Sequence, residues 1–547
     1  MPQPNTSSEG CAAVPDVEHI CIMMVHGVGE QKRFEYLEEL ANNLYRALKK
    51  EPKRRAYLQV RWGDQTARGA VGVNWSEVPA LLGWRKDNGG RIEAALREIH
   101  WSDLDEPYTF WSWLKLASWS LSMPGLCLYS RRATHTELPD MQEPGSASKF
   151  NLKMRAQLFL TAMLFFCMLI SLDLVYWLVQ RLSFKPKILR NARGLIYDYL
   201  GDVKLYQDWC LRKKDTESIE VAGGKSRAAI RRRMLRAILR TALEGEGGKC
   251  DGYYIVAHSL GTVIAYNALM TPGQDIAHCL TEEEWNSLPA VFKKKMAPYP
   301  DNFEMPVRPP WLTPEDGIDR ERLFSKMRGL VTLGSPLNKF AALWPAIVPV
   351  NTESLGRTDP QSKIPWINVS DLQDIVAGNK LRFIAEQKAV GTLTDFELTD
   401  IAWADQTTMF SAHTSYWKMH ENKQRLIDLL IPWLEGQGIT QPRDNLNPKL
   451  ALTLYVCGIV GLSLLGALVL AYLIWLTPRT GMLVRASLNP NFGMNEIIAI
   501  LRPVYFDAIL DRFVKIMVVG FATVSVFSLA RCIGERWRFR RLLSRAS

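Results

Sequence analysis

The chain has 547 residues, of which 47% are hydrophobic and 22% charged, with 36 glycines and 29 prolines. This composition excludes a disordered polyelectrolyte and a low-complexity fibre. Lys and Arg outnumber Asp and Glu by 67 to 56, a net charge of +11. Because the basic runs flank apolar ones and no zinc-finger spacing accompanies them, the charge favours contact with an anionic membrane surface over nucleic-acid binding. The nine cysteines include no C-x-x-C pair, which favours a reducing compartment.

The first predicted unit is a strand, a glycine turn and a helix. Residues 19–25 form a short apolar run, which predicts a buried strand that ends at the sequence HGVG, residues 26–29. Residues 34–50 then place leucines at spacings of three and four, the pattern of an amphipathic helix. Two further strands are predicted at residues 57–62 and 95–101.

Four segments are apolar enough to concern a membrane. Residues 156–180 carry a single charge and residues 450–476 carry none, so each predicts a transmembrane helix. Residues 516–530 precede an arginine-rich tail, which predicts a further span whose tail stays in the cytoplasm. Residues 108–130 combine three tryptophans with a lysine and several serines, a composition that fits a span, a re-entrant segment, an interfacial helix or a buried soluble helix.

The most informative motif is AHSLG at residues 257–261. It follows the apolar run 253–257, a predicted strand, and precedes the helical pattern of residues 262–269. The pattern small residue-x-Ser-x-Gly between a strand and a helix is typical of a nucleophile elbow. Small residues are needed because the strand and the helix nearly touch at this sharp turn. The sequence therefore predicts that Ser259 is a nucleophile.

The stretches around this motif predict an α/β domain. Residues 226–243 predict a helix whose six arginines indicate a solvated face, with a phospholipid-facing patch as the alternative. Residues 271–327 are rich in proline and charge and predict an inserted cap or lid, because a structureless loop of that length is unusual in a compact domain. Strands are predicted at 329–333 and 366–370, and a closing helix at 424–435. Alternating strands and helices predict a mostly parallel sheet.

These motifs resemble the α/β-hydrolase superfamily, and within it the lipase-like serine esterases, whose elbow often reads HSLG. Ala257 stands where the family more usually has a glycine. The turn at residues 26–29 is similar to the family's oxyanion-hole turn, and TLGSP at residues 332–336 is similar to its strand after the elbow helix. Residues 371–374 lie where its acid loop would be, and AHTSYW at residues 412–417 is similar to its histidine loop.

The other two members of a triad can be sought by chain order. This architecture orders the triad as Ser, acid and His, which leaves His278, His413 and His420 after the nucleophile. His278 precedes two predicted strands and comes too early, so His413 is preferred and His420 is the alternative. Asp374 and Asp371 both follow the last predicted strand. Asp374 is preferred because a residue further into the turn has more freedom to reach an imidazole.

This triad implies acyl transfer. His413 would remove the proton of Ser259 as the hydroxyl attacks a carbonyl, and Asp374 would hold the tautomer of the imidazole. The backbone N–H groups of Leu260 and Val28 are the candidates for the oxyanion hole. The sequence shows no metal-ligand cluster, and the glycine turn lacks the Lys-Ser/Thr of a phosphate loop, so neither a metal nor another cofactor is expected.

The predicted organisation has four parts. Residues 1–107 begin the hydrolase domain, residues 108–182 insert a membrane hairpin, residues 183–440 complete the hydrolase domain with the lid at 271–327, and residues 441–547 form a C-terminal transmembrane hairpin and basic tail. If the strands on both sides of the insertion share one sheet, the insertion either crosses the bilayer twice or dips into one leaflet. The basic tail then places the catalytic domain in the cytoplasm.

The sequence thus predicts an integral membrane serine hydrolase that cleaves ester bonds of lipid substrates, of the lipase or phospholipase type. An esterase fixed at a bilayer is best supplied with acyl lipids, and fold analogy carries part of this step. Membrane lipid is the expected partner, nucleic acid is not, and the sequence is compatible with an oligomer. A deacylase or thioesterase of lipidated proteins is the second enzymatic interpretation, and a membrane scaffold with a degenerate hydrolase fold is the non-enzymatic one.

Overall fold

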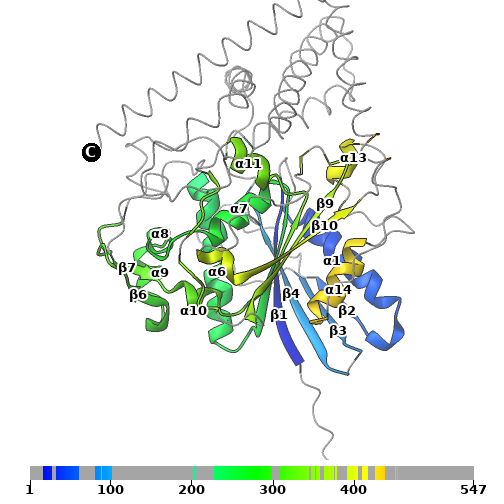
Figure 1. The fold of residues 1–547 in the computed structure, drawn as a ribbon. Helices are drawn as coiled ribbons and strands as arrows, with labels where there is room; N and C mark the ends of the chain where they lie inside the picture. The colour runs from blue at the N-terminus through cyan, green and yellow to red at the C-terminus, as the bar shows by residue number, and fades with distance from the viewer. Residues whose placement is uncertain are drawn as a thin grey trace, which may run out of the picture.

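The described part of the chain is arranged around one eight-stranded sheet with helices on both of its faces (Figure 1). The computed structural model describes residues 17–27, 33–60, 80–87, 89–101, 203, 206, 227–297, 308–343, 347–351, 353–357, 362–374, 376–377, 391–403, 409–414, 416, 425–437, 450 and 453.

Most strands of this sheet are parallel. Its spatial order is β10 (Phe396–Trp403), β9 (Ile364–Asp371), β8 (Met327–Leu333), β5 (Gly252–His258), β1 (Val17–Val25), β4 (Arg91–Ile99), β3 (Ala80–Arg85) and β2 (Tyr57–Val60). Neighbours from β10 to β4 are parallel, whereas β3 and β2 extend the sheet as antiparallel strands. This arrangement confirms the predicted α/β class with a mostly parallel sheet.

Helices cover both faces of the sheet (Figure 1). On one face lie α1 (Glu35–Lys49) and α14 (Arg425–Leu434), and on the other lie α6 (Arg227–Glu246) and α7 (Leu260–Leu269). A strand covered on both sides buries successive side chains on opposite faces and reads as a continuous apolar run. The run in β1 follows this rule. Its side chains on the face of α6 and α7 are Cys21, Met23 and Val25. Those on the face of α1 and α14 are Ile20, Ile22 and Met24.

Two short helices follow strands at the carboxyl end of the sheet, α11 (Leu337–Leu343) after β8 and α13 (Met409–Thr414) after β10. Figure 1 shows both at the same end of the domain. Because the carboxyl ends of parallel strands share one edge of a sheet, ligands and catalytic groups collect there in open α/β folds. The loops that could carry a site are therefore those that follow β1, β5, β8, β9 and β10.

The predicted cap or lid at residues 271–327 has secondary structure in its described part. It contains α8 (Gly273–His278), α9 (Glu282–Ser287), the antiparallel pair β6 (Lys293–Lys295) and β7 (Asp316–Ile318), and α10 (Arg320–Phe324). Its apolar side chains, such as Phe292 and Ile318, join the core cluster of α6. Figure 1 shows these elements on the flank of the domain beside α6, and a lid function stays a prediction.

The arginine-rich helix α6 differs from the prediction. A solvated face was expected for its arginines, but Arg227, Arg231 and Arg232 are buried. The Arg232 Nε donates a hydrogen bond of 2.6 Å to the carbonyl oxygen of Cys279, just after α8. The reason is that the inserted elements pack against the side of α6 that the sequence alone leaves open.

Most predicted elements are confirmed in type where they are described. This holds for the strands at 19–25, 57–62, 95–101, 253–257, 329–333 and 366–370 and for the helices at 34–50, 226–243, 262–269 and 424–435. The strands β3 and β10 were not predicted. In β10 only Phe396, Ile401 and Trp403 are buried, so no clear alternation appears, and in β3 a glycine, Gly83, interrupts the apolar run.

The predicted membrane segments at 108–130, 156–180, 450–476 and 516–530 lie outside the described residues, apart from Leu450 and Thr453. Among the helices that the structure does describe, none has both the length and the apolar character needed to cross a bilayer.

Gly329 in β8 gives a test of how tightly α14 packs on the sheet. A Cβ built at this position would collide with the indole ring of Trp433. We expect Gly329→Ala to lower stability by about 1–3 kcal/mol through overpacking, seen as a lower thermal unfolding midpoint in detergent. Gly247→Ala is the matched control, because its Cβ would meet nothing closer than 3.6 Å. Equal midpoints for the two variants would contradict this packing.

Candidate active site

The turn between β5 and α7 holds Ser259 in a backbone conformation that side chains rarely adopt. Its φ is 53° and its ψ is −127°. Ser259 is one of three non-glycine residues with a positive φ in the described part of the chain. The Ser259 N–H donates to the carbonyl oxygen of Leu333 in β8 at 2.9 Å, and the Thr262 hydroxyl donates to the carbonyl oxygen of Ser259 at 2.7 Å. Strain of this kind persists only where neighbouring bonds over-determine the backbone, and it is concentrated at functional sites.

Two glycines allow this turn to approach β1. A Cβ on Gly261 would lie 2.5 Å from the carbonyl oxygens of both Val25 and His26, so only glycine fits at the start of α7. A Cβ on Gly27 would lie 2.6 Å from the Cβ of Ser259. The predicted requirement for a small residue after the serine is thus explained by a contact with backbone atoms of another strand.

The structure brings the three predicted triad residues together. The His413 Nε2 lies 2.8 Å from the Ser259 Oγ, and the His413 Nδ1 lies 2.9 Å from Oδ2 and 3.0 Å from Oδ1 of Asp374. The three side chains come from different elements: the turn after β5, the helix α13 and the loop after β9. All three residues are buried. This is the order of bonds that a serine nucleophile, a general base and an orienting carboxylate require.

The carboxylate of Asp374 is held in its ionised form. Burial alone would raise its pKa, but the charge and hydrogen bond of His413 oppose this effect. The backbone N–H groups of Val376 and Ala377 also donate to Oδ1, at 2.8 and 3.1 Å. Together with the hydroxyl of Tyr416, these donors hold the pKa of Asp374 below its usual range. The group can therefore accept the Nδ1–H of His413 and fix its tautomer.

The proposed oxyanion donors are described only in part. Leu260 is the first residue of α7, so its N–H has no acceptor within the helix and is available at the turn. Val28 lies outside the described residues. Its neighbour Gly27 is described and lies against Ser259, so the first two residues of the glycine turn are at the same end of the sheet as the serine.

A bonded pair of residues holds the start of that glycine turn. The backbone N–H of Trp101 donates to the His26 Nε2 at 3.2 Å, so the Nδ1 carries the proton and donates to the Gly27 carbonyl oxygen at 2.9 Å. The indole N–H of Trp101 donates to the His26 carbonyl oxygen at 3.1 Å, and the two rings are stacked with centroids 5.1 Å apart. Neither residue was given a role by the sequence analysis.

Tyr416 is a further site residue that sequence reasoning did not single out. Its hydroxyl donates to the Asp374 Oδ2 at 2.9 Å and accepts the backbone N–H of Asp371 at 2.8 Å. Burial and the adjacent Asp374 charge raise the pKa of Tyr416 well above its usual value, so the hydroxyl keeps its proton. Its place three residues after His413 is the signal that the sequence offered.

The alternative triad residues lie elsewhere or outside the described residues. Asp371, the second candidate acid, uses its Oδ1 to accept the backbone N–H of Gln373 at 2.9 Å, and the described bonds to His413 come from Asp374. His278 lies on α8, on the flank of the domain, with its Nδ1 4.0 Å from Asp275. His420 is not described.

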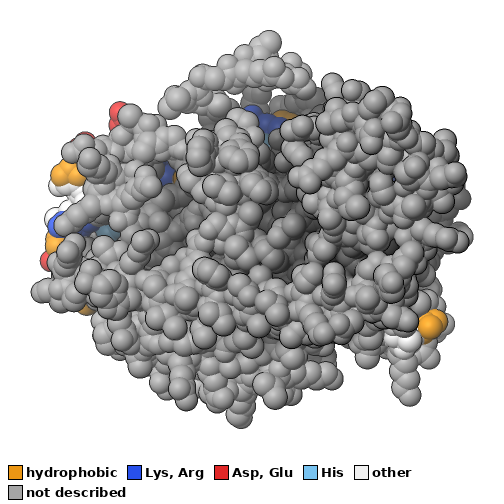
Figure 2. All heavy atoms as spheres, turned by 90° about the horizontal axis from the view of Figure 1, so that it is seen from above, with side chains coloured by type: hydrophobic (Ala, Val, Ile, Leu, Met, Phe, Trp, Pro, Cys, Tyr) orange, Lys and Arg blue, Asp and Glu red, His pale blue; other side chains and the backbone are white. Residues whose placement is uncertain are grey.

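Figure 2 looks onto the end of the domain that carries this site. In this view the described side chains reach the surface mainly near the margins of the picture. The triad itself is little exposed: Ser259 is 1%, Asp374 3% and His413 7% exposed. Hydrogen bonds within the site therefore lie in a poorly solvated environment, where they are stronger than in water.

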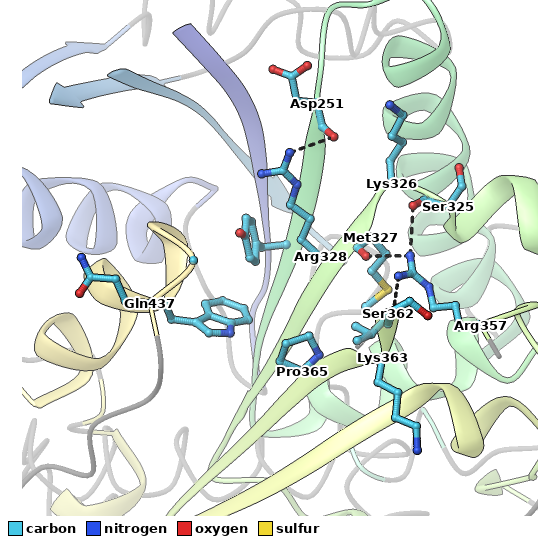
Figure 3. Close-up of a pocket in the computed structure, with 14 residues that line it drawn as sticks. Asp251, Ser325, Lys326, Met327, Arg328, Arg357, Ser362, Lys363, Pro365 and Gln437 are labelled. Atoms are coloured by element: carbon cyan, nitrogen blue, oxygen red, sulfur yellow. Dashed lines mark hydrogen bonds between the residues drawn. The ribbon is translucent and has the colours of Figure 1, made fainter. Parts of the chain in front are cut away.

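A cavity of about 410 Å³ lies at the opposite edge of the sheet, beside the amino-terminal ends of β5, β8 and β9 (Figure 3). Its arginines already have partners. Arg357 donates to the backbone oxygens of four residues, and Arg328 pairs with Glu18. The amino groups of Lys326 and Lys363 point away from one another (Figure 3). Among the described residues that line this cavity, no set of polar side chains points toward a common centre, in contrast to Ser259, His413 and Asp374 at the carboxyl ends of the strands.

Within the described residues, no group of three or more His, Cys, Asp or Glu side chains is placed to hold a metal ion. No protein-family model matches the chain, and no curated protein or solved structure is significantly similar to it. What the site can do is accordingly argued from its own geometry.

Tyr416→Phe tests the bonds that hold the acid. The variant removes a donor to Asp374 and leaves the buried N–H of Asp371 without its acceptor, so we expect a loss of about 1–3 kcal/mol and a lower thermal unfolding midpoint. Tyr45→Phe on α1 is the matched control, because its ring contact with Lys49 does not need the hydroxyl. A midpoint for Tyr416→Phe equal to that of the control would show that these bonds contribute nothing.

Proposed function

We propose that the protein is a serine hydrolase of the carboxylic ester type and that Ser259, His413 and Asp374 are its catalytic residues. The observation that carries the proposal is the unbroken chain of short contacts from the strained serine through the imidazole to an ionised carboxylate. A serine with a positive φ at a strand-to-helix turn, bonded to a histidine 154 residues away, has no evident packing purpose.

We also propose that the domain has the α/β-hydrolase fold. The support is the position of the turn: β5 lies near the middle of a mostly parallel sheet, and the candidate residues follow β5, β9 and β10 in the order Ser, Asp and His. The mixed edge made by β3 and β2 is compatible with this fold. The fold in turn makes the glycine turn after β1 the natural source of the second oxyanion donor.

In this mechanism His413 takes the proton of Ser259 through Nε2 as the Oγ attacks the ester carbonyl carbon. Asp374 stabilises the imidazolium that results and holds its Nδ1–H. The negative oxygen of the tetrahedral intermediate accepts hydrogen bonds from the backbone N–H groups of Leu260 and Val28. The imidazolium then gives its proton to the leaving alcohol, and a water activated by the same histidine releases the acyl group from the serine.

For the substrate we propose the acyl ester of a membrane lipid. The support is the sequence: the apolar segments 156–180 and 450–476 are long enough to fix the enzyme at a bilayer, and the basic tail after residue 530 suits the cytoplasmic side. Deacylation of lipidated proteins is the second candidate, since it uses the same acyl-enzyme. Lipid esters and acyl thioester peptides presented in the same mixed micelles distinguish the two.

A fluorophosphonate probe tests the proposed nucleophile, because an activated serine displaces fluoride from phosphorus and keeps the label. We expect the purified full-length protein in detergent to be labelled and Ser259→Ala to be unlabelled, with His413→Ala slower by about 10⁴-fold or more. Thermal unfolding of each variant serves as the control for folding. A folded wild-type protein that takes up no label, or a Ser259→Ala variant that still does, would refute the proposal.

The identity of the acid is tested separately by a matched pair of amide variants. Asp374→Asn removes the charge that orients His413 and should lower the rate of ester hydrolysis by about 10³–10⁴-fold. Asp371→Asn keeps the Oδ1 that accepts the N–H of Gln373 and should react at close to the wild-type rate. A large loss in Asp371→Asn with little loss in Asp374→Asn would reverse the assignment.

A further inference from the structure

His258 lies directly before the nucleophile, at the end of β5, and has no part in the mechanism above. It is 3% exposed, so its polar ring is enclosed within the protein. Its neighbours are parts of the candidate site: the ring centroid is 5.0 Å from that of His413 and 5.7 Å from that of Tyr416. A buried imidazole at this position needs a structural or chemical reason.

The ring makes one directed bond to the loop of the catalytic histidine. Its Nε2 lies 2.9 Å from the backbone carbonyl oxygen of His413. A carbonyl oxygen can only accept, so the proton of His258 is on Nε2 and this N–H donates. The two imidazole planes are inclined by 29°, a stacked arrangement. His258 thus holds the backbone of the residue whose side chain reaches Ser259.

The charge state of His258 is fixed as well. The pKa of His258 is lowered to about 3, first by burial and then by the neighbouring His413, while the bond to the His413 carbonyl and the charge of Asp374 act in the opposite sense. The ring is therefore neutral throughout the neutral pH range. A neutral ring can stack beside His413 when that residue becomes an imidazolium, whereas a second cation at this distance would oppose proton transfer from Ser259.

This bond matters because α13, which carries His413, has only six residues. Its catalytic side chain is held at Nδ1 by Asp374, and the backbone of the same residue is held by His258. These two contacts, one at the backbone carbonyl and one at the Nδ1 of His413, together set the position of its Nε2 relative to the Ser259 Oγ. A displacement of about 1 Å in such a contact can lower a rate by about 10²-fold.

We propose that His258 is a positioning residue, which clamps the backbone carbonyl of His413 through its Nε2–H and so keeps the base aligned with the nucleophile. This inference rests on the proposed serine hydrolase activity. It gives a chemical role to the histidine of the AHSLG motif, which the elbow geometry does not itself require.

The test compares His258→Gln with His258→Leu in the full-length protein. The glutamine amide can present an N–H where Nε2 stands, whereas leucine fills similar space without a donor. With a short-chain p-nitrophenyl ester, we expect the leucine variant to lose about 10–100-fold in kcat with little change in KM, since substrate contacts are untouched. We expect the glutamine variant to recover most of that loss.

The outcomes separate this inference from the proposed function. If wild-type protein takes up no fluorophosphonate, the proposed function fails and the role of His258 fails with it. If wild-type protein is labelled and the leucine variant has the wild-type kcat, only the positioning role fails. Equal losses in the two variants would overturn the hydrogen bond as the cause. If the leucine variant does not fold, as judged by thermal unfolding, a folded glutamine variant with a kcat below a tenth of wild type would still overturn the proposal.

Discussion

The contact between the first turn of α7 and the end of β1 determines where Ser259 and the residues around it can lie. A Cβ added to Gly261 would lie 2.5 Å from the carbonyl oxygens of Val25 and His26, at the end of β1, so the chain must turn sharply between β5 and α7. The strain of that turn falls on Ser259, with its φ of 53°. The bonds to Leu333 and Thr262 keep the serine there. Gly27 also lies against Ser259, so the packing of α7 on the end of β1 places the serine beside the residues that follow β1.

The parallel sheet then supplies the remaining groups at the same edge. Gly334, which follows β8, has a φ of 58° and leaves room for Asp374, Tyr416 and His413, which a Cβ there would approach to between 2.9 and 3.2 Å. Asp374 follows β9, and its charge is balanced by donors from its own loop and from Tyr416. Buried polar networks are favourable only when their members are satisfied, which explains why so many donors meet at this carboxylate.

The sequence was informative where a local rule fixes a local structure. The elbow at residues 257–261 was recognisable because its glycine, serine and flanking periodicities are consequences of one tight turn. The strand β10 was missed because it is an edge strand with few buried side chains. The strand β3 lies between β4 and β2 and was missed because Gly83 interrupts its apolar run, where the ring of Tyr57 in β2 lies over the glycine. The arginines of α6 were misjudged because helical spacing does not show which other segment covers a face.

The supporting residues of the site were beyond sequence reasoning for a different reason. His258 and Tyr416 act through hydrogen bonds to residues 155 and 42 positions away, and no spacing rule predicts such pairs. Sequence order could nominate Ser259, His413 and Asp374 through the resemblance to the α/β-hydrolases, whose triad has a fixed order. It could not nominate the groups that hold them, since those depend on which backbone atoms face each other after folding.

The charges of the site form a consistent set only if His258 is neutral. Asp374 is ionised before reaction, and in the proposed mechanism proton transfer from Ser259 to His413 adds a cation beside it and an anion at the oxyanion position. In this proposed mechanism Asp374 stabilises the new cation through its contact of 2.9 Å with the His413 Nδ1. A charged ring stacked 5.0 Å away would act against it at the low dielectric of the interior. The low pKa of His258, about 3 and due first to burial, therefore keeps a second cation away from His413 in the proposed proton transfer.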